Sequence, residues 1–169
     1  MKECRKWQRP GKEPIAASSV ATKFNEHVEM DLMFYRRFTI CHFIDRASRW
    51  HAAVTVESKH DTGLIEALLV CWIQIHGPMK YLIVDGESGV VKSEPFKAEL
   101  LARGIELRPR APQQHARYIE RRGALLRQAL HVIEGQMQTE GIIVTFPMLL
   151  AEAVFAGNCL TYVGGVTPY

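Results

Sequence analysis

The sequence has few cysteines and lacks the ligand spacings of zinc sites. Its four cysteines lie far apart, and neither a Cys-x₂-Cys pair nor a His-x₃-His pair occurs among them and the seven histidines. Structural zinc sites need such closely spaced ligands, and disulfide frameworks belong to secreted chains with paired cysteines. We therefore expect no zinc, no disulfide, and a nuclear or other intracellular location rather than secretion.

Long hydrophobic runs are also missing. No apolar stretch approaches the roughly 18 residues that a membrane-spanning helix needs, and the first residues, MKECRKWQRPGKEP, contain no apolar core of a signal peptide. With 169 residues, of which 47% are hydrophobic, the chain is long and apolar enough for one globular domain. We expect a soluble protein with no membrane partner.

Hydrophobic periodicity is absent from the first 24 residues. They contain six lysines and arginines together with proline, glycine, alanine and serine, which is typical of a basic, poorly ordered arm. We therefore expect residues 1–24 to be an arm and residues 25–169 to form the folded domain.

Short β-prone runs open that domain. They lie at residues 27–35 (HVEMDLMFY), 38–45 (FTICHFID) and 50–57 (WHAAVTVE), and their short connections predict an antiparallel meander. Downstream, the sequence predicts helices at about 60–76, 92–103, 115–137 and 145–162, and strands at 81–85 and 105–111. This order predicts an α/β fold: a five-stranded mixed sheet, its first three strands antiparallel, flanked by helices.

Three acids stand out against these elements. Asp31 interrupts the apolar strand VEMDLMF, Asp85 ends the strand YLIVDG, and Glu120 opens the helix YIERRGALLRQAL. A carboxylate inside a buried strand is unfavourable unless a positive charge compensates it, so this set indicates a bound cation. Mg²⁺ fits best, because it is a hard cation that prefers carboxylate and water oxygens to His or Cys.

Each acid also has a simpler explanation. Asp31 could face solvent on an edge strand, and Asp85 could start an Asp-Gly turn. Glu120 could pair with Arg117 or Arg121 on its own helix. For any one acid alone the simpler explanation is adequate, and only the set of three favours a metal site.

Positive charge is concentrated around the third acid. Residues 103–127 hold seven arginines against two glutamates, a net charge of +5, whereas the whole chain carries +3, so the remainder carries about −2. Such a cluster beside carboxylates predicts contact with nucleic acid, and the alternative is a solvated helix face. We assign this contact to Arg117, Arg121, Arg122 and Arg127. Arg127 lies two helical turns after Glu120 on nearly the same face.

Taken together, these features resemble the catalytic core (the rve domain) of retroviral-type integrases from retroviruses and retrotransposons, members of the DDE superfamily with an RNase H-like fold. The matching segments are VEMDLMF, HFIDRASRW, LIVDGESG, IERR and the final TPY, spread over roughly residues 24–169. The three acids follow one another at spacings of 54 and 35 positions, which also suit this family.

The resemblance implies a Mg²⁺-dependent or Mn²⁺-dependent polynucleotidyl transferase that processes the 3′ ends of element DNA, a nuclease reaction, and joins them to target DNA. In that chemistry two ions activate the attacking oxygen and stabilise the leaving oxygen at phosphorus. By the resemblance, Asp31 bridges both ions, Asp85 holds one and Glu120 holds the other. The resemblance also implies a homodimer or larger assembly on DNA.

The chain departs from this family in three places. Trp7 stands where Cys4 would need a second cysteine, so residues 1–24 are expected to be a remnant of the zinc module that precedes such cores. The Asn-Gly pair common before the third acid is replaced in QQHARYIE, and a glycine-free loop is stiffer. The chain ends at Tyr169, so we expect a fragment without the C-terminal DNA-binding domain.

Two other functions stay open. A decayed element could leave a catalytically inactive module that binds nucleic acid or assembles with protein. An RNase H-like nuclease fits less well, because such sites usually use four acids and we can nominate only three. Asp45 also matches the family pattern, but the Asp-Arg-Ala-Ser cluster that it begins is a turn in its own right, and we leave it out of the site.

Overall fold

The computed structural model describes residues 21–57, 60–86, 89–110, 117–160 and 167–168, except the side chain of Arg117. The expected arm, with Cys4 and Trp7, therefore lies outside the described residues up to position 20. Residues 21–24 are described, and the ring of Phe24 stacks on Trp72 with centroids 6.3 Å apart. Phe24 is therefore packed against the domain.

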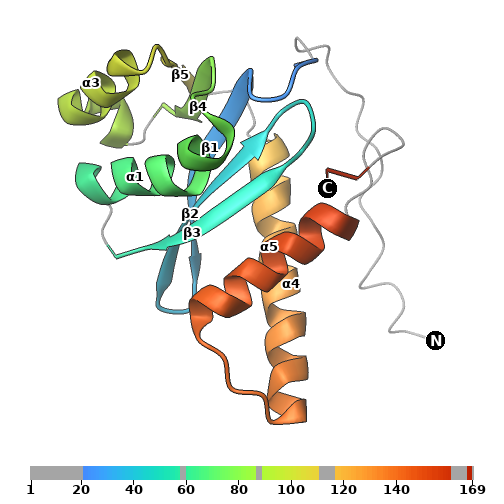
Figure 1. The fold of residues 1–169 in the computed structure, drawn as a ribbon. Helices are drawn as coiled ribbons and strands as arrows, with labels where there is room; N and C mark the ends of the chain where they lie inside the picture. Colours follow the sequence, from blue (N-terminus) through green and yellow to red (C-terminus); the bar gives the residue numbers. More distant parts are fainter. Residues whose placement is uncertain (1–20, 58–59, 87–88, 111–116, 161–166, 169) are drawn as a thin grey trace, which may run out of the picture.

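The elements follow the predicted order. Three strands come first, then one long helix in three parts, and afterwards strands and helices alternate until two helices close the chain (Figure 1). The bounds are β1 His27–Tyr35, β2 Phe38–Asp45, β3 His51–Val56, α1 Asp61–Leu68, η2 Leu69–Ile73, α2 Gln74–His76, β4 Tyr81–Asp85, η3 Gly89–Lys92, α3 Glu94–Ala102, β5 Glu106–Arg110, α4 Arg117–Glu140 and α5 Phe146–Leu160.

A single mixed sheet organises the domain. Its strand order is β3-β2-β1-β4-β5, with β1, β2 and β3 antiparallel and with β4 parallel to both β1 and β5. β1 is therefore the central strand, and it joins the meander to the parallel half. The predicted five-stranded α/β architecture is confirmed.

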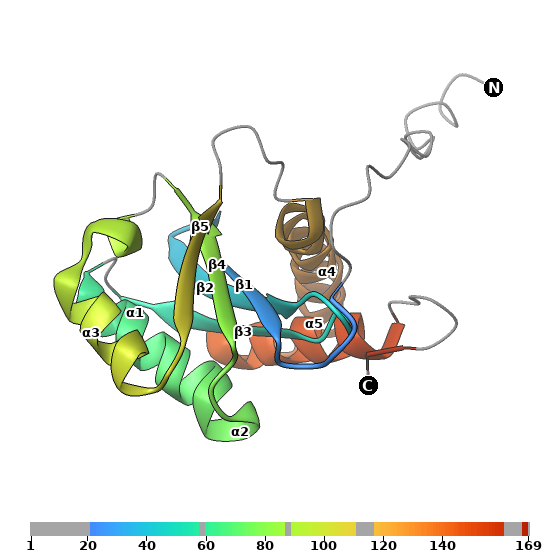
Figure 2. The ribbon, with the colours of Figure 1, turned by 90° about the horizontal axis from the view of Figure 1, so that it is seen from above.

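Helices cover both faces of the sheet, with α1 and α3 on one side and α4 and α5 on the other (Figure 2). Val28 and Met30 of β1 belong to the core under the first pair of helices, together with Trp72. Met33 and Tyr35 belong to the core under α4 and α5. Because side chains alternate along a strand, Glu29 and Asp31 fall on the face that α4 and α5 cover.

A π-helical turn interrupts the first long helix. η2 lies between α1 and α2, and it brings Trp72 into the core, where this side chain is fully buried. The indole N–H of Trp72 donates to Oδ1 of Asn25 at 2.9 Å, and Nδ2 of Asn25 donates to the carbonyl oxygen of His76, also at 2.9 Å. Asn25 therefore fixes the end of this helix against the entry to β1.

No helix in the described ranges is both long enough and apolar enough to cross a membrane.

Candidate active site

Asp31 and Asp85 lie on neighbouring parallel strands, just beyond the point where the pairing between these strands ends. β1 and β4 are paired only as far as Glu29 and Ile83, so the strands part just before Asp31, and Asp85 is the last residue of β4. Both residues line one cavity of about 740 Å³ that opens beside the start of α1. The carboxyl ends of parallel strands are the usual binding edge of an open α/β sheet.

Glu120 approaches these acids from the first turn of α4, where its side chain is exposed. The pKa of Asp31 is raised above its usual value, chiefly by burial and further by the negative charges of Asp85 and Glu120. Two contacts oppose this rise: the backbone N–H of Leu32, which donates to Oδ1 of Asp31 at 2.8 Å, and the positive charge of Arg110. The fold thus brings the three predicted acids into one electrostatic neighbourhood.

The three carboxylates do not meet at the distance of a shared ion. Among the residues that the structure describes, no three His, Cys, Asp or Glu side chains are grouped closely enough to hold a metal. The donor set itself suits Mg²⁺, since it offers carboxylate oxygens only. The convergence of the three acids on shared ions therefore stays a prediction, and it requires their side chains to move closer together.

The predicted DNA-contacting arginines fall in different environments. Arg121 and Arg127 are exposed on α4, and the side chain of Arg117 lies outside the described set. Arg122 is only 4% exposed, its Nη2 donates to Oδ1 of Asn158 on α5 at 2.8 Å, and burial lowers its pKa to about 10. This corrects the prediction for Arg122, which belongs to the packing between α4 and α5 rather than to an exposed face.

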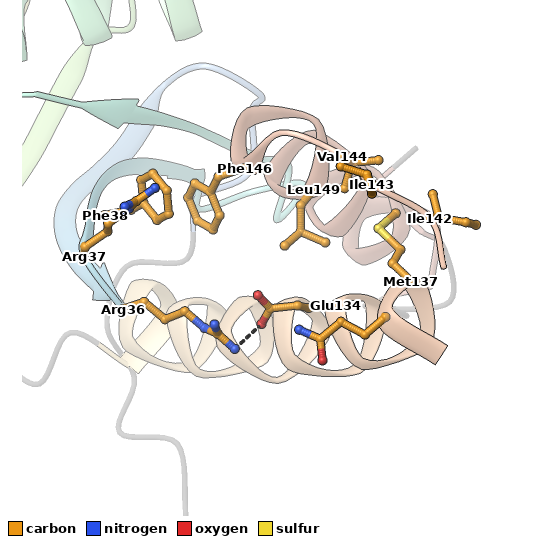
Figure 3. Close-up of a pocket in the computed structure, with 11 residues that line it drawn as sticks. Arg36, Arg37, Phe38, Glu134, Met137, Ile142, Ile143, Val144, Phe146 and Leu149 are labelled. Carbon is orange, nitrogen blue, oxygen red and sulfur yellow. Dashed lines mark ion pairs between the residues drawn. The ribbon is translucent and has the colours of Figure 1, made fainter. Parts of the chain in front are cut away.

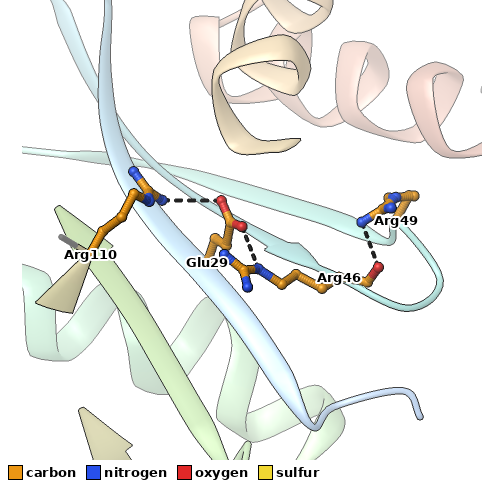
Figure 4. A network of polar contacts seen from close by, with 4 residues as sticks. All are labelled: Glu29, Arg46, Arg49 and Arg110. Atoms are coloured by element: carbon orange, nitrogen blue, oxygen red, sulfur yellow. Dashed lines mark hydrogen bonds and ion pairs between the residues drawn. The ribbon is translucent and has the colours of Figure 1, made fainter. Parts of the chain in front are cut away.

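The main feature that the sequence analysis missed is a buried ion-pair network beside Asp31. Glu29 is 1% exposed and accepts hydrogen bonds from Nε of Arg46 at 2.5 Å and from Nη2 of Arg110 at 3.2 Å (Figure 4). The signal in the sequence was the alternation of β1, which places Glu29 on the same face as Asp31. This carboxylate is engaged by two guanidinium groups, so it does not supply the fourth acid of an RNase H-like nuclease.

Asp45 has the turn role that we assigned to it. It is fully buried and accepts hydrogen bonds from the backbone N–H groups of Asn25 and Ser48 and from the Ser48 hydroxyl, at 2.6 to 2.9 Å. The segment QQHA, in which we expected a stiff loop, lies outside the described residues. Asp61 and His60, at the start of α1, line the Asp31 cavity and were not singled out from the sequence.

A second cavity, of about 590 Å³, is unsuited to phosphoryl transfer. It lies between the β1–β2 turn, the end of α4 and the start of α5, and its walls include Phe38, Met137 and Phe146 (Figure 3). Its only acid among the described lining residues, Glu134, is paired with Arg36 at 2.8 Å. The cavity around Asp31 and Asp85 is therefore the candidate site.

Comparisons with known proteins agree with this architecture. No family model and no curated protein sequence matches the chain. Among solved structures, the catalytic core of HTLV-2 integrase, in a dimeric complex with magnesium, has 15% identity and a TM-score of 0.73, covering 86% of this chain and 94% of that one. The core of BIV integrase has 17% identity and a TM-score of 0.72, covering 86% and 91%.

A larger assembly gives a similar match. The simian T-cell lymphotropic virus intasome in complex with PP2A regulatory subunit B56 gamma contains a chain with 16% identity and a TM-score of 0.79, and the match covers 99% of this chain and 61% of that one. Identities this low establish the fold and leave the activity to be argued from the site. The chain has the RNase H-like fold of retroviral integrase catalytic cores.

Proposed function

We propose that this domain is the catalytic core of a DNA integrase, a Mg²⁺-dependent polynucleotidyl transferase. Its substrates are the 3′ ends of element DNA and a target DNA duplex, and it acts as a dimer or larger assembly. One observation above the others supports this proposal: Asp31 and Asp85 line the same cavity, just beyond the point where the parallel strands β1 and β4 part, in a fold shared with integrase cores.

The roles of the residues follow from their positions. Bound Mg²⁺ would supply charge stabilisation for the attacking and leaving oxygens at phosphorus. Asp31 is on the central strand, and the charges of both other acids act on it, so it would be the central member of the donor set. Asp85 would provide oxygens from the end of β4, and Glu120 would provide them from the exposed first turn of α4.

DNA approaches over α4. Arg121 and Arg127 are exposed on the helix that carries Glu120, so they contact backbone phosphates on either side of the reacting one. Such contacts orient the duplex without reading its sequence. The preferred DNA ends are therefore set elsewhere in the assembly.

The direct test is strand transfer on branched or gapped DNA with Mg²⁺ or Mn²⁺. Nicking or joining is expected in the presence of either ion, and Asp31→Asn, Asp85→Asn and Glu120→Gln should each abolish it. Glu152→Gln, an exposed acid on α5, is the matched control and should leave the rate unchanged. Activity that survives all three site substitutions rules the proposal out.

One observation favours a second function, a catalytically inactive nucleic-acid-binding or assembly module. The three acids are not grouped at ion-binding distance among the described residues. A binding module retains DNA affinity without divalent ions, and Asp31→Asn leaves that affinity unchanged or raises it. Measuring DNA binding and joining on the same preparations separates the two functions.

A further inference from the structure

The network around Glu29 has more positive than negative charge. One carboxylate, 1% exposed, is engaged by two guanidinium groups, Arg46 from the β2–β3 turn and Arg110 from the end of β5. The side chain of Arg110 is only 8% exposed. Two guanidinium charges against one carboxylate leave a surplus positive charge in a largely buried place, which is unfavourable unless another anion is close.

Strand register shows which anions are close. Arg110 is the pairing partner of Asp85 across β4 and β5. Glu29, to which Arg110 donates, is two residues from Asp31 on the same face of β1. Among the described residues, Arg110 supplies the positive charge that acts on Asp31, whereas the negative charges of Asp85 and Glu120 repel it.

The backbone holds Arg110 in this position. A Cβ atom on Gly86 would lie 2.7 Å from the carbonyl oxygen of Arg110, so the chain after Asp85 passes directly against the end of β5. A side chain at position 86 would force these two segments apart. The Asp-Gly pair therefore serves a close approach between the strand that carries Asp85 and the strand that carries Arg110.

The same network reaches the helix of the third acid. Nη1 of Arg49 donates to the carbonyl oxygen of Arg46, and the Arg49 guanidinium lies 3.5 Å from the ring centroid of Tyr118. Tyr118 is in the first turn of α4, two residues before Glu120. Contacts thus run from Arg110 through Glu29 and the β2–β3 turn to the helix end that carries Glu120.

We infer that Arg110 is a positioning residue of the acidic site: anchored on Glu29, its guanidinium supplies the positive charge that holds Asp31 beside the other two acids before divalent ions bind. This inference rests on the proposed function, because it assumes that the three acids form a metal site. In the metal-free protein, the Arg110 guanidinium supplies the positive charge at that site. When ions bind, their charge takes over this role and Arg110 then repels them. Removing the Arg110 charge therefore weakens the metal-free site and strengthens metal binding.

The first test measures metal affinity by calorimetry with Mn²⁺ and Mg²⁺. Arg110→Gln should bind about fivefold more tightly than the wild type, since a unit charge beside a divalent ion has been removed. Arg110→Lys keeps the charge and should stay within about twofold of the wild type. Arg108→Gln is the matched control on the same strand, where Arg108 is exposed and pairs with Glu106 at 2.8 Å, and it should change nothing. Equal affinity in Arg110→Gln and wild type, or weaker affinity in Arg110→Gln, overturns the inference.

The second test needs no metal. In a double-mutant cycle without divalent ions, Arg110→Gln should lower the unfolding midpoint, and this loss should be at least halved in an Asp31→Asn background. An equal loss in both backgrounds shows that Arg110 merely packs against Glu29, and it overturns the inference. If Arg110 is coupled to Asp31 but the wild type binds no metal, the role of Arg110 stands and the proposed enzyme is rejected. Failure of the inference and failure of the proposed function are therefore distinguishable.

Discussion

Asp31 of β1 lies directly opposite His42 of β2 in their antiparallel pair. His42 is buried, and its Nδ1 is 3.2 Å from Nε2 of His51 on β3, which is also buried. The half-buried acid therefore has a neutral imidazole pair on one side, and its positive neighbour, Arg110, is on the other. This arrangement makes the stability of the domain sensitive both to pH and to the charge at position 31.

Acidification should destabilise the domain through His42. Burial lowers the pKa of His42 to about 4, and burial also depresses the pKa of His51. Because the histidine has the higher pKa in the unfolded state, the unfolded state takes up the proton first as the pH falls. The contribution of His42 to the free energy of unfolding is therefore intact above about pH 6.5 and decreases toward pH 4. Between pH 6.5 and 5 the free energy of unfolding should drop by about 1.5 kcal/mol from His42 alone.

Urea denaturation at pH 5, 6, 7 and 8 measures this drop. His42→Gln should flatten the profile, and His60→Gln, an exposed histidine, should leave its shape unchanged. A profile that is flat in the wild type would show that His42 is not held neutral by burial.

Replacing Asp31 with asparagine should stabilise the metal-free domain. The pKa of Asp31 is raised in the folded state, so its ionised form at neutral pH opposes folding, and this opposition grows as the pH rises through the folded pKa. Asparagine keeps the size of the side chain and removes the charge. The melting temperature without divalent ions should rise by a few degrees, the usual scale when a functional site is neutralised.

Scanning calorimetry checks the effect, with Glu66→Gln on α1 as a control at an exposed acid. With millimolar Mn²⁺ the wild type should have the higher melting temperature, because it gains stability from the ion and Asp31→Asn does not. A lower melting temperature for Asp31→Asn in the absence of metal contradicts the account of Asp31.

Two glycines of α4 should respond differently to alanine. Gly135 has open space around it, so Gly135→Ala should stabilise the helix by about 0.5–1 kcal/mol. At Gly123 a Cβ would lie 3.3 Å from Cε1 of His42, so the buried His42 ring or α4 would have to shift by a few tenths of an ångström. Gly123→Ala should therefore give no gain or a loss. Equal stabilisation by both substitutions in urea melts would mean that α4 is not seated closely over His42.

Salt dependence tests the DNA-contacting face. Arg121→Gln and Arg127→Gln should each reduce the slope of log affinity against log salt by about 0.9, as expected for one lost phosphate contact on duplex DNA. Arg103→Gln provides the control, because this arginine follows α3 and pairs with Glu99 at 2.5 Å. Fluorescence anisotropy over a range of salt concentrations gives the slopes. If the slope changes only with Arg103→Gln, the DNA does not contact α4.

The strands and their order along the chain were predictable because they depend on local pattern. The predicted bounds of β1 and β2 match those of the structure, since both runs alternate clearly and are separated only by Arg36 and Arg37. The long helix begins at Arg117 and continues to Glu140, two residues later at its start and three later at its end than expected. Periodicity fixes the type of an element better than its ends.

The surroundings of the site were less predictable, because they depend on residues far apart in the chain. Glu29 is 17 positions from Arg46 and 81 from Arg110, and no local pattern indicates that these three side chains meet. The burial of Arg122 likewise depends on Asn158, 36 positions away on α5. Charge counting could identify a basic segment around Glu120, but it could not tell which of its arginines point into the protein.

Anomalous diffraction from a crystal soaked in Mn²⁺ locates a bound ion without relying on turnover, so it shows whether the three acids form a metal site. The account predicts an anomalous peak bounded by carboxylate oxygens of Asp31 and Asp85, with Glu120 drawn toward it relative to the metal-free protein. A well-diffracting crystal with no peak at these residues at millimolar Mn²⁺, or with a peak elsewhere only, would contradict it.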